Sequence, residues 1–156
     1  MDHISLAEQL GDEVDAFYSK YRDLDDESAS RRPGEDSWSP KEIIGHLIDS
    51  ASNNHQRFVR LQIQEKLVFP GYGKDNMRWV TIEHYNDMRY GDVLSLWRAY
   101  NVLIVNIIRN ADPAKLQNYW DGDEGKKTLL DLMTSYVDHL KGHLATFSIT
   151  LEKMVN

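Results

Sequence analysis

Three histidines are the residues of this sequence whose type and spacing point most directly to chemistry. His139 and His143 are four residues apart near the C-terminus, and His46 lies in an earlier apolar segment. Neutral imidazoles that meet inside a protein can bind one divalent transition metal and leave coordination positions open for water or substrate. Because a pair of histidines four residues apart is a weak motif by itself, the prediction depends on which helix faces these residues occupy.

The last predicted helix places the histidine pair beside its apolar face. With 100° per residue and His139 at zero, His143 lies at about 40°, inside an apolar arc from about 20° to 120°. The side chains in that arc are Leu129, Leu132, Met133, Tyr136, Leu140, Phe147, Leu151 and Met154. We therefore predict an inward-facing pair. The alternative is two core histidines, each of which needs a buried hydrogen-bond partner.

The segment around His46 carries a polar stripe beside an apolar face. On a helix the stripe lies within about 60° of His46; it consists of Asp49, Ser50, Asn53 and Arg57. The stripe faces either a functional site or only solvent. In the first case, Asp49 is the candidate that orients a ligand or bonds to metal-bound water, and Asn53 and Arg57 are candidate substrate contacts. His55 lies about 180° from His46 and therefore belongs to a different face.

The remaining polar motifs indicate no other kind of catalytic site. His3 precedes the first predicted helix cap and is expected to be exposed, and His84 is either a fourth ligand or a packing or surface residue. The acidic run from Asp121 to Glu124 lacks the length and spacing of a calcium loop and is expected to be a solvated turn. The sequence contains no nucleophile elbow, no glycine-rich phosphate loop and no Glu-x-x-His pair.

Composition limits the compartment and the partners. The chain has 156 residues, a length typical of one domain, and we expect residues 1–156 to form a single one. It has no cysteine, so a sulfur nucleophile would have to come from a bound small thiol. No signal peptide or membrane-spanning segment is evident, which indicates the cytoplasm. The net charge of −7 argues against nucleic acid as a partner.

Capping motifs and hydrophobic periodicity predict the first two helices. The first begins at the capping box Ser5-Leu-Ala-Glu8 and carries apolar residues every three or four positions. The second begins at Ser39, has Pro40 at its first helical position and extends to about Glu65.

Two further helices complete the predicted fold. The third spans about residues 92–110, and the fourth is capped by Thr128 and Asp131 and continues towards the C-terminus. No segment alternates with period two over strand length. The fold class is therefore all-α, most simply a four-helix bundle.

The two long connectors between these helices carry information of their own. The segment 66–91 is too long for a plain bundle turn and can cross the whole bundle, which would let helices two and three run parallel. Its aromatic residues suit either a packed lid or a long loop that they pin in place; they are Phe69, Tyr72, Trp79 and Tyr85. The segment 111–127 is expected to end in a tight turn before helix four.

Several of these stretches, in the same order, are similar to those of a known family. They are residues 38–50, Asn53 and residues 57–58, then residues 72–80, and finally residues 125–129 leading to the histidine pair. The chain thereby resembles the DinB-like superfamily, most closely its YfiT-like branch of metal-dependent hydrolases. The resemblance implies an up-down-down-up four-helix bundle with a nickel- or zinc-type ion held by His46, His139 and His143. Relatives include bacillithiol-type and mycothiol-type S-transferases, and homodimers are common in the family.

From the residues and the resemblance together we predict a metal-dependent enzyme that acts on a small molecule. The nucleophile is activated at the three-histidine centre, and the reaction is either hydrolysis or transfer of a low-molecular-weight thiol. The expected metal is nickel or zinc, and the expected assembly is a homodimer that binds neither nucleic acid nor membrane. The alternative is a non-catalytic, dimeric metal-binding or stress-response helical module.

Overall fold

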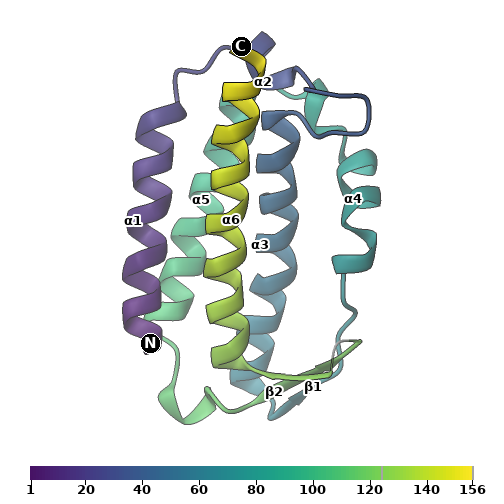
Figure 1. Ribbon diagram of the computed structural model, residues 1–156. Coiled ribbons are helices and arrows are strands. Elements are labelled where there is room, and N and C mark those ends of the chain that lie inside the picture. The colour runs from purple at the N-terminus through teal and green to yellow at the C-terminus, as the bar shows by residue number, and fades with distance from the viewer. Residues whose placement is uncertain (124, 156) are drawn as a thin grey trace.

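The computed structural model describes residues 1–123 and 125–155. Four long helices form the body of the molecule; they are α1 (His3–Tyr21), α3 (Pro40–Ile63), α5 (Tyr90–Arg109) and α6 (Leu129–Val155). α1 and α3 each pack against both α5 and α6. Along the bundle axis, α1 and α6 run in one direction, and α3 and α5 run in the other (Figure 1). The predicted up-down-down-up four-helix bundle is confirmed.

The parallel pair α3 and α5 requires a crossover along the outside of the bundle. The crossover contains the helix α4 (Asn76–Glu83), which lies between two short 3-10 helices, η1 (Gly73–Asp75) and η2 (Tyr85–Asp87). α4 packs against α3, and Figure 1 shows it alongside that helix on the outer side of the bundle. Of the two alternatives for this connector, a packed cover over α3 is therefore the one observed.

Side-chain caps fix the beginnings of the two helices that carry the candidate site. Ser39 Oγ accepts a hydrogen bond of 3.1 Å from Glu42 N, and the Glu42 carboxylate accepts one of 2.9 Å from Ser39 N. Before α6, Thr128 Oγ1 accepts from Asp131 N at 3.1 Å, and Asp131 Oδ2 accepts from Thr128 N at 3.0 Å. The starts predicted at Ser39 and Thr128 are thus both present as reciprocal caps, and each satisfies backbone N–H groups that a helix start leaves unpaired.

The N-terminal helix begins two residues earlier than the predicted cap at Ser5. Asp2 Oδ1 accepts a hydrogen bond of 2.8 Å from Ser5 N, so Asp2 is the cap and His3 the first helical residue. His3 is consequently buried, and its predicted exposure is wrong. A short helix, α2 (Asp26–Ser30), follows α1 in the connector that leads to α3.

A small three-stranded sheet closes one end of the bundle, where no strand was expected. It consists of β1 (Lys66–Leu67), β2 (Tyr119–Gly122) and β3 (Gly125–Thr128). β1 pairs with β2 in parallel, and β2 pairs with β3 in an antiparallel hairpin. Strands of two to four residues are too short to display a period of two in the sequence. The hairpin is the predicted turn before α6, and it follows the 3-10 helix η3 (Pro113–Lys115).

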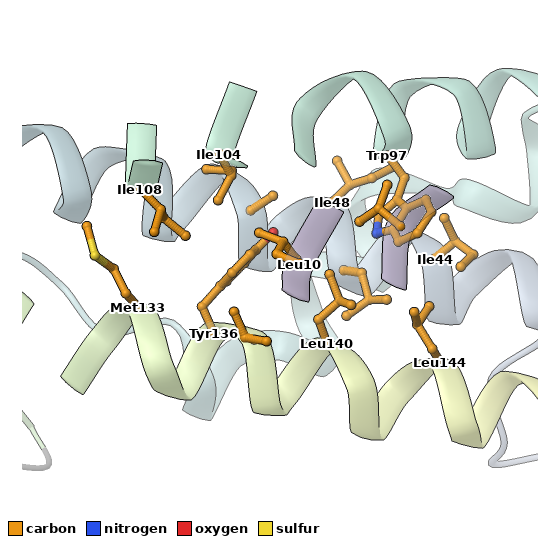
Figure 2. Close-up of a cluster of buried hydrophobic side chains, with 14 of the residues drawn as sticks. Leu10, Ile44, Ile48, Trp97, Ile104, Ile108, Met133, Tyr136, Leu140 and Leu144 are labelled. Carbon is orange, nitrogen blue, oxygen red and sulfur yellow. The ribbon is translucent and has the colours of Figure 1, made fainter. Parts of the chain in front are cut away.

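Apolar side chains from all four long helices meet along the bundle axis. Figure 2 shows Leu10 of α1, Ile44 of α3, Trp97 of α5 and Leu140 of α6 directed towards one another. Burial of each such side chain contributes about 1.5–3 kcal/mol to folding, so this core holds α3 and α6 in fixed register. Within the described part of the chain, no helix combines the length and the apolarity needed to cross a lipid bilayer.

Candidate metal centre

The structure brings His46 of α3 together with His139 and His143 of α6. His46 Nε2 lies 3.2 Å from His139 Nε2, and one ring nitrogen of each of the three residues lies within 4.8 Å of the others. Two nitrogen ligands at about 2.0–2.1 Å from a tetrahedral ion are about 3.3 Å apart. The distance between His46 and His139 is therefore already close to the spacing of two ligands of one metal.

The three histidines lie at the border of the core, where the buried face of α3 meets the edge of α6. His46 is buried, His143 is half-buried and His139 is exposed at the surface. The reason is that the buried arc of α6 also includes Val137 and Leu144, which shifts its centre away from the histidine pair. The pair therefore faces α3 and the crossover rather than the centre of the bundle, which leaves the imidazoles accessible from outside.

The surroundings keep the imidazoles neutral. Burial lowers the pKa of His46 to about 3, and the neighbouring His143 and His139 rings add to this effect. Although part of His139 is exposed, the protein groups packed around its ring, and then the neighbouring His143, lower its pKa to about 4. Burial also lowers the pKa of His143. These imidazoles are therefore neutral at neutral pH. A neutral imidazole has a free lone pair on one ring nitrogen and is the form that binds a metal.

Tyr72 of the crossover fixes the orientation of the His46 ring. Its Oη lies 3.1 Å from His46 Nδ1 and 3.4 Å from the His46 carbonyl oxygen. With Nε2 turned towards His139, the hydrogen of His46 belongs on Nδ1, which donates to Tyr72 Oη while the Tyr72 hydroxyl donates to the carbonyl oxygen. A histidine that ligates a metal commonly donates its other ring N–H in this way. The sequence placed Tyr72 in the aromatic connector but gave no signal of this contact.

The donor set fits a divalent transition metal. His143 Nδ1 is buried and has no hydrogen-bond partner among the described residues, an arrangement that costs free energy in a metal-free protein. The His46 and His139 nitrogens face each other although both rings are neutral, so at most one of them can donate to the other. Imidazole nitrogens suit zinc and nickel among other transition metals, and three protein ligands leave a coordination position open.

Asp49, the residue expected to orient a ligand or bond to metal-bound water, forms a hydrogen bond to the crossover. It is buried, and its Oδ1 accepts a hydrogen bond of 2.6 Å from the hydroxyl of Tyr85. Its Oδ2 has no hydrogen-bond partner among the described residues. Burial raises the pKa of Asp49 to about 7, despite the opposing effect of the Tyr85 hydrogen bond. The carboxylate therefore joins α3 to the crossover one turn beyond His46.

A cavity of about 230 Å³ opens beside His139; we call it the polar cavity because most of the residues in its wall have polar or charged side chains. Its wall includes Arg57, one of the two residues predicted as substrate contacts, and Tyr72. Asn53 is not part of this wall; its Nδ2 donates to the Asp49 carbonyl oxygen at 2.9 Å within α3. The neighbouring Asn54 lines the cavity instead.

A second cavity, of about 380 Å³, adjoins His143. We call it the Trp38 cavity; its wall includes Trp38, Ile43, Met77 and Thr146. Along both helices the three histidines fall between the two cavities. Ile43 of α3 and Thr146 of α6 lie on one side, and Arg57 of α3 and Leu132 of α6 lie on the other. His139 thus borders one cavity and His143 the other, whereas His46 is buried between them.

The other three histidines lie outside this cluster. His55 is on another face of α3, where its Nδ1 lies 3.0 Å from Tyr100 Oη of α5. His84 is exposed, adopts a left-handed backbone conformation at φ 51° and lies 3.8 Å from the Asp87 carboxylate.

Asp121 of the acidic turn forms an ion pair with Lys66 at 3.1 Å, whereas Glu124 lies outside the described residues.

Comparisons with known proteins agree with this architecture. The sequence profile of the DinB superfamily matches residues 9–147. Among solved structures, YfiT from Bacillus subtilis superimposes with a TM-score of 0.83 at 16% sequence identity, over 97% of this chain and 87% of that one. YfiT is described as a probable metal-dependent hydrolase with an unusual four-helix bundle topology. A comparison with curated proteins found no match.

Proposed function

The chain belongs to the DinB superfamily, and from that premise we propose that it is a metal-dependent enzyme acting on a small molecule. His46, His139 and His143 are the proposed protein ligands of one divalent transition metal, with nickel or zinc as the expected ion. The observation that carries this proposal is the convergence of three neutral imidazoles between two cavities. YfiT, which shares the fold, is itself described as a probable metal-dependent hydrolase.

The proposed metal would activate the nucleophile, and the residues around it would orient a ligand and admit the substrate. A divalent metal held by three neutral ligands keeps its full charge and supplies Lewis acidity, which lowers the pKa of a water molecule or thiol. Tyr72 holds the His46 ring in the orientation that presents Nε2 to the cluster. The polar cavity and the Trp38 cavity admit substrates from either side of the imidazoles.

Two reactions are consistent with this site, namely hydrolysis and S-transfer. The chain has no cysteine, so transfer requires a low-molecular-weight thiol as cosubstrate, whereas hydrolysis requires only water. Turnover of a halogenated aromatic that depends on both metal and added thiol would establish transfer. Ester or amide cleavage at the same rate without thiol would establish hydrolysis. No turnover by the metal-loaded protein would favour the non-catalytic, dimeric metal-binding module instead.

The decisive test separates ligands from other histidines. We expect about one divalent metal per chain by elemental analysis of protein without a histidine tag. Replacement of His46, His139 or His143 by Ala should each reduce this content sharply and remove the metal-dependent increase in Tm. His3→Ala and His55→Ala are the matched controls and should retain the metal. Loss of metal in His55→Ala with retention in His46→Ala would overturn the assignment.

A further inference from the structure

The polar cavity carries positive charge in an acidic protein. Its described wall contains three cationic side chains, Arg57, Lys74 and Lys127, and one anionic side chain, Asp123. The whole chain, by contrast, has a net charge of −7. Positive charge gathered in a cavity of such a protein attracts anionic small molecules and raises their local concentration.

Arg57 is buried and held in one orientation in the wall of this cavity. Only 6% of its surface is exposed. Its guanidinium lies 4.6 Å from the centre of the Trp120 ring and donates to the Pro70 carbonyl oxygen at 3.2 Å. Trp120 is fixed in turn, because its Nε1 donates to the Phe69 carbonyl oxygen at 2.8 Å. A guanidinium held in this way loses little conformational entropy when it binds a planar anion.

The same cavity reaches the proposed metal centre. His139 and Arg57 both line it, and neutral polar side chains from Ser50 and Ser135 lie in the wall as well. A small molecule in this space can therefore direct one end to the imidazoles and place an acidic group at the guanidinium. The Trp38 cavity on the other side of the histidines has one anionic and one cationic side chain in its wall, Asp36 and Lys153, and therefore offers no comparable excess of positive charge.

We propose that the polar cavity binds the carboxylate of a small acidic substrate, with Arg57 as the principal contact and Lys74 and Lys127 as supporting charges. Arg57 is the single guanidinium in this wall, and Asp123, 4.0 Å from Lys74, offsets part of the lysine charge; this balance favours a singly charged planar carboxylate over a doubly charged phosphate. The position of the reacting group rests on the proposed metal centre, whereas recognition of the carboxylate depends on the cavity alone.

The test compares a charged and a neutral thiol of similar size on the same protein. Affinities of 3-mercaptopropionate and 2-mercaptoethanol for the cobalt-loaded protein are read from the sulfur-to-cobalt absorption band. The wild type should bind the charged thiol roughly 10-fold more tightly, the size of effect expected for one charge-assisted hydrogen bond. Arg57→Gln should remove this preference, so that the affinity for 3-mercaptopropionate falls to that for 2-mercaptoethanol. Lys74→Gln, at an exposed position, should reduce the preference without a risk to folding.

Arg60→Gln is the matched control. Arg60 is also on α3, and its guanidinium lies 5.7 Å from the centre of the Phe69 ring, as that of Arg57 does at 5.9 Å. Arg60 is not part of the cavity wall, so the preference should survive its replacement. Equal affinity of the two thiols for the wild type, or a full preference in both Arg57→Gln and Lys74→Gln, would overturn the proposal. Tighter binding of methyl phosphate than of propionate would also overturn it.

Failure of the metal centre can be recognised separately. If cobalt does not bind, propionate binding to the metal-free protein can still be measured by ligand-observed NMR. Loss of that binding in Arg57→Gln, but not in Arg60→Gln, would support the carboxylate site even though the metal centre had been disproved. Equal propionate binding by the wild type and Arg57→Gln would disprove the carboxylate site.

Discussion

The hydroxyl of Tyr85 donates a hydrogen bond of 2.6 Å to Asp49, and through this buried contact the crossover is joined to the helix that carries His46. The two residues meet because α3 has Gly45 one turn before Asp49. A Cβ atom at position 45 would lie 2.1 Å from Tyr85 Cδ2. The absence of a side chain there allows the ring to lie directly against the helix, and the hydroxyl then reaches the carboxylate.

Asp49→Asn should stabilise the metal-free protein at high pH. Burial raises the pKa of Asp49 to about 7 from its ordinary value of 3.8, so the folded state binds more protons than the unfolded state between these values. The contribution of Asp49 to stability is therefore fully present below about pH 3.8 and is lost as the pH rises towards 7. Asparagine does not titrate. In the presence of chelator, the free energy of unfolding of the variant should therefore rise relative to that of the parent between pH 5 and pH 8. Urea unfolding of parent and variant at pH 5 and at pH 8 measures this change. The same difference in free energy of unfolding between parent and variant at the two pH values would disprove the prediction.

Tyr72→Phe should weaken metal binding without removing a ligand. The variant loses the hydroxyl that holds His46 Nδ1 at 3.1 Å, and loss of such a partner reduces metal affinity by about 10-fold to 100-fold. Tyr100→Phe is the matched control, because its hydroxyl bonds to His55 on another face of α3. Competition against a chelator of known affinity measures both variants. An affinity for Tyr72→Phe equal to that of the control would count against the orienting role.

Gly45→Ala should destabilise the fold by about 1–3 kcal/mol, the usual cost of overpacking, because the added methyl group overlaps the Tyr85 ring. Gly142→Ala is the matched control within α6. A Cβ atom there meets nothing within 4 Å, so alanine should raise stability by up to about 1 kcal/mol through helix propensity. Chemical denaturation of the two variants should therefore show changes of opposite sign; destabilisation of both would refute the packing argument.

The metal-free protein should lose stability in mild acid. The folded-state pKa of His46 is about 3 and that of His139 about 4, both below the ordinary value of 6.5. Between these folded-state values and pH 6.5, the unfolded state therefore binds more protons than the folded state. Stability contributed by the neutral rings is present above pH 6.5 and is lost as the pH falls towards 4. Replacement of His46 by Gln should reduce the drop in Tm between pH 7 and pH 4.5. A variant with the parent's full acid sensitivity would show that this ring is not responsible.

The sequence was informative for most of the structural features that are local. The capping pairs at Ser39 and Thr128 predicted two helix starts, and helical periodicity separated the face of His46 from that of His55. Asp2 escaped notice because a second acceptable cap, Ser5, stands three residues later.

Contacts made by the crossover were not predictable in this way. Tyr72 is 26 residues from His46, and Tyr85 is 36 residues from Asp49. The path of a long connector is set by packing against the finished bundle, and no local period in the sequence encodes it. The same holds for Arg57, whose position beside Trp120 depends on a sheet built from two connectors.

The distance along the chain between the imidazoles also determines when they can act together. His46 and His139 are 93 residues apart, so their meeting requires α6 to dock against α3. A chain that has not completed this docking offers no three-nitrogen site, and an ion bound there would stabilise the native state far more than the folding transition state. Metal added to the refolding buffer should therefore leave the folding rate almost unchanged. It should slow unfolding, so that the ion stabilises the folded protein kinetically.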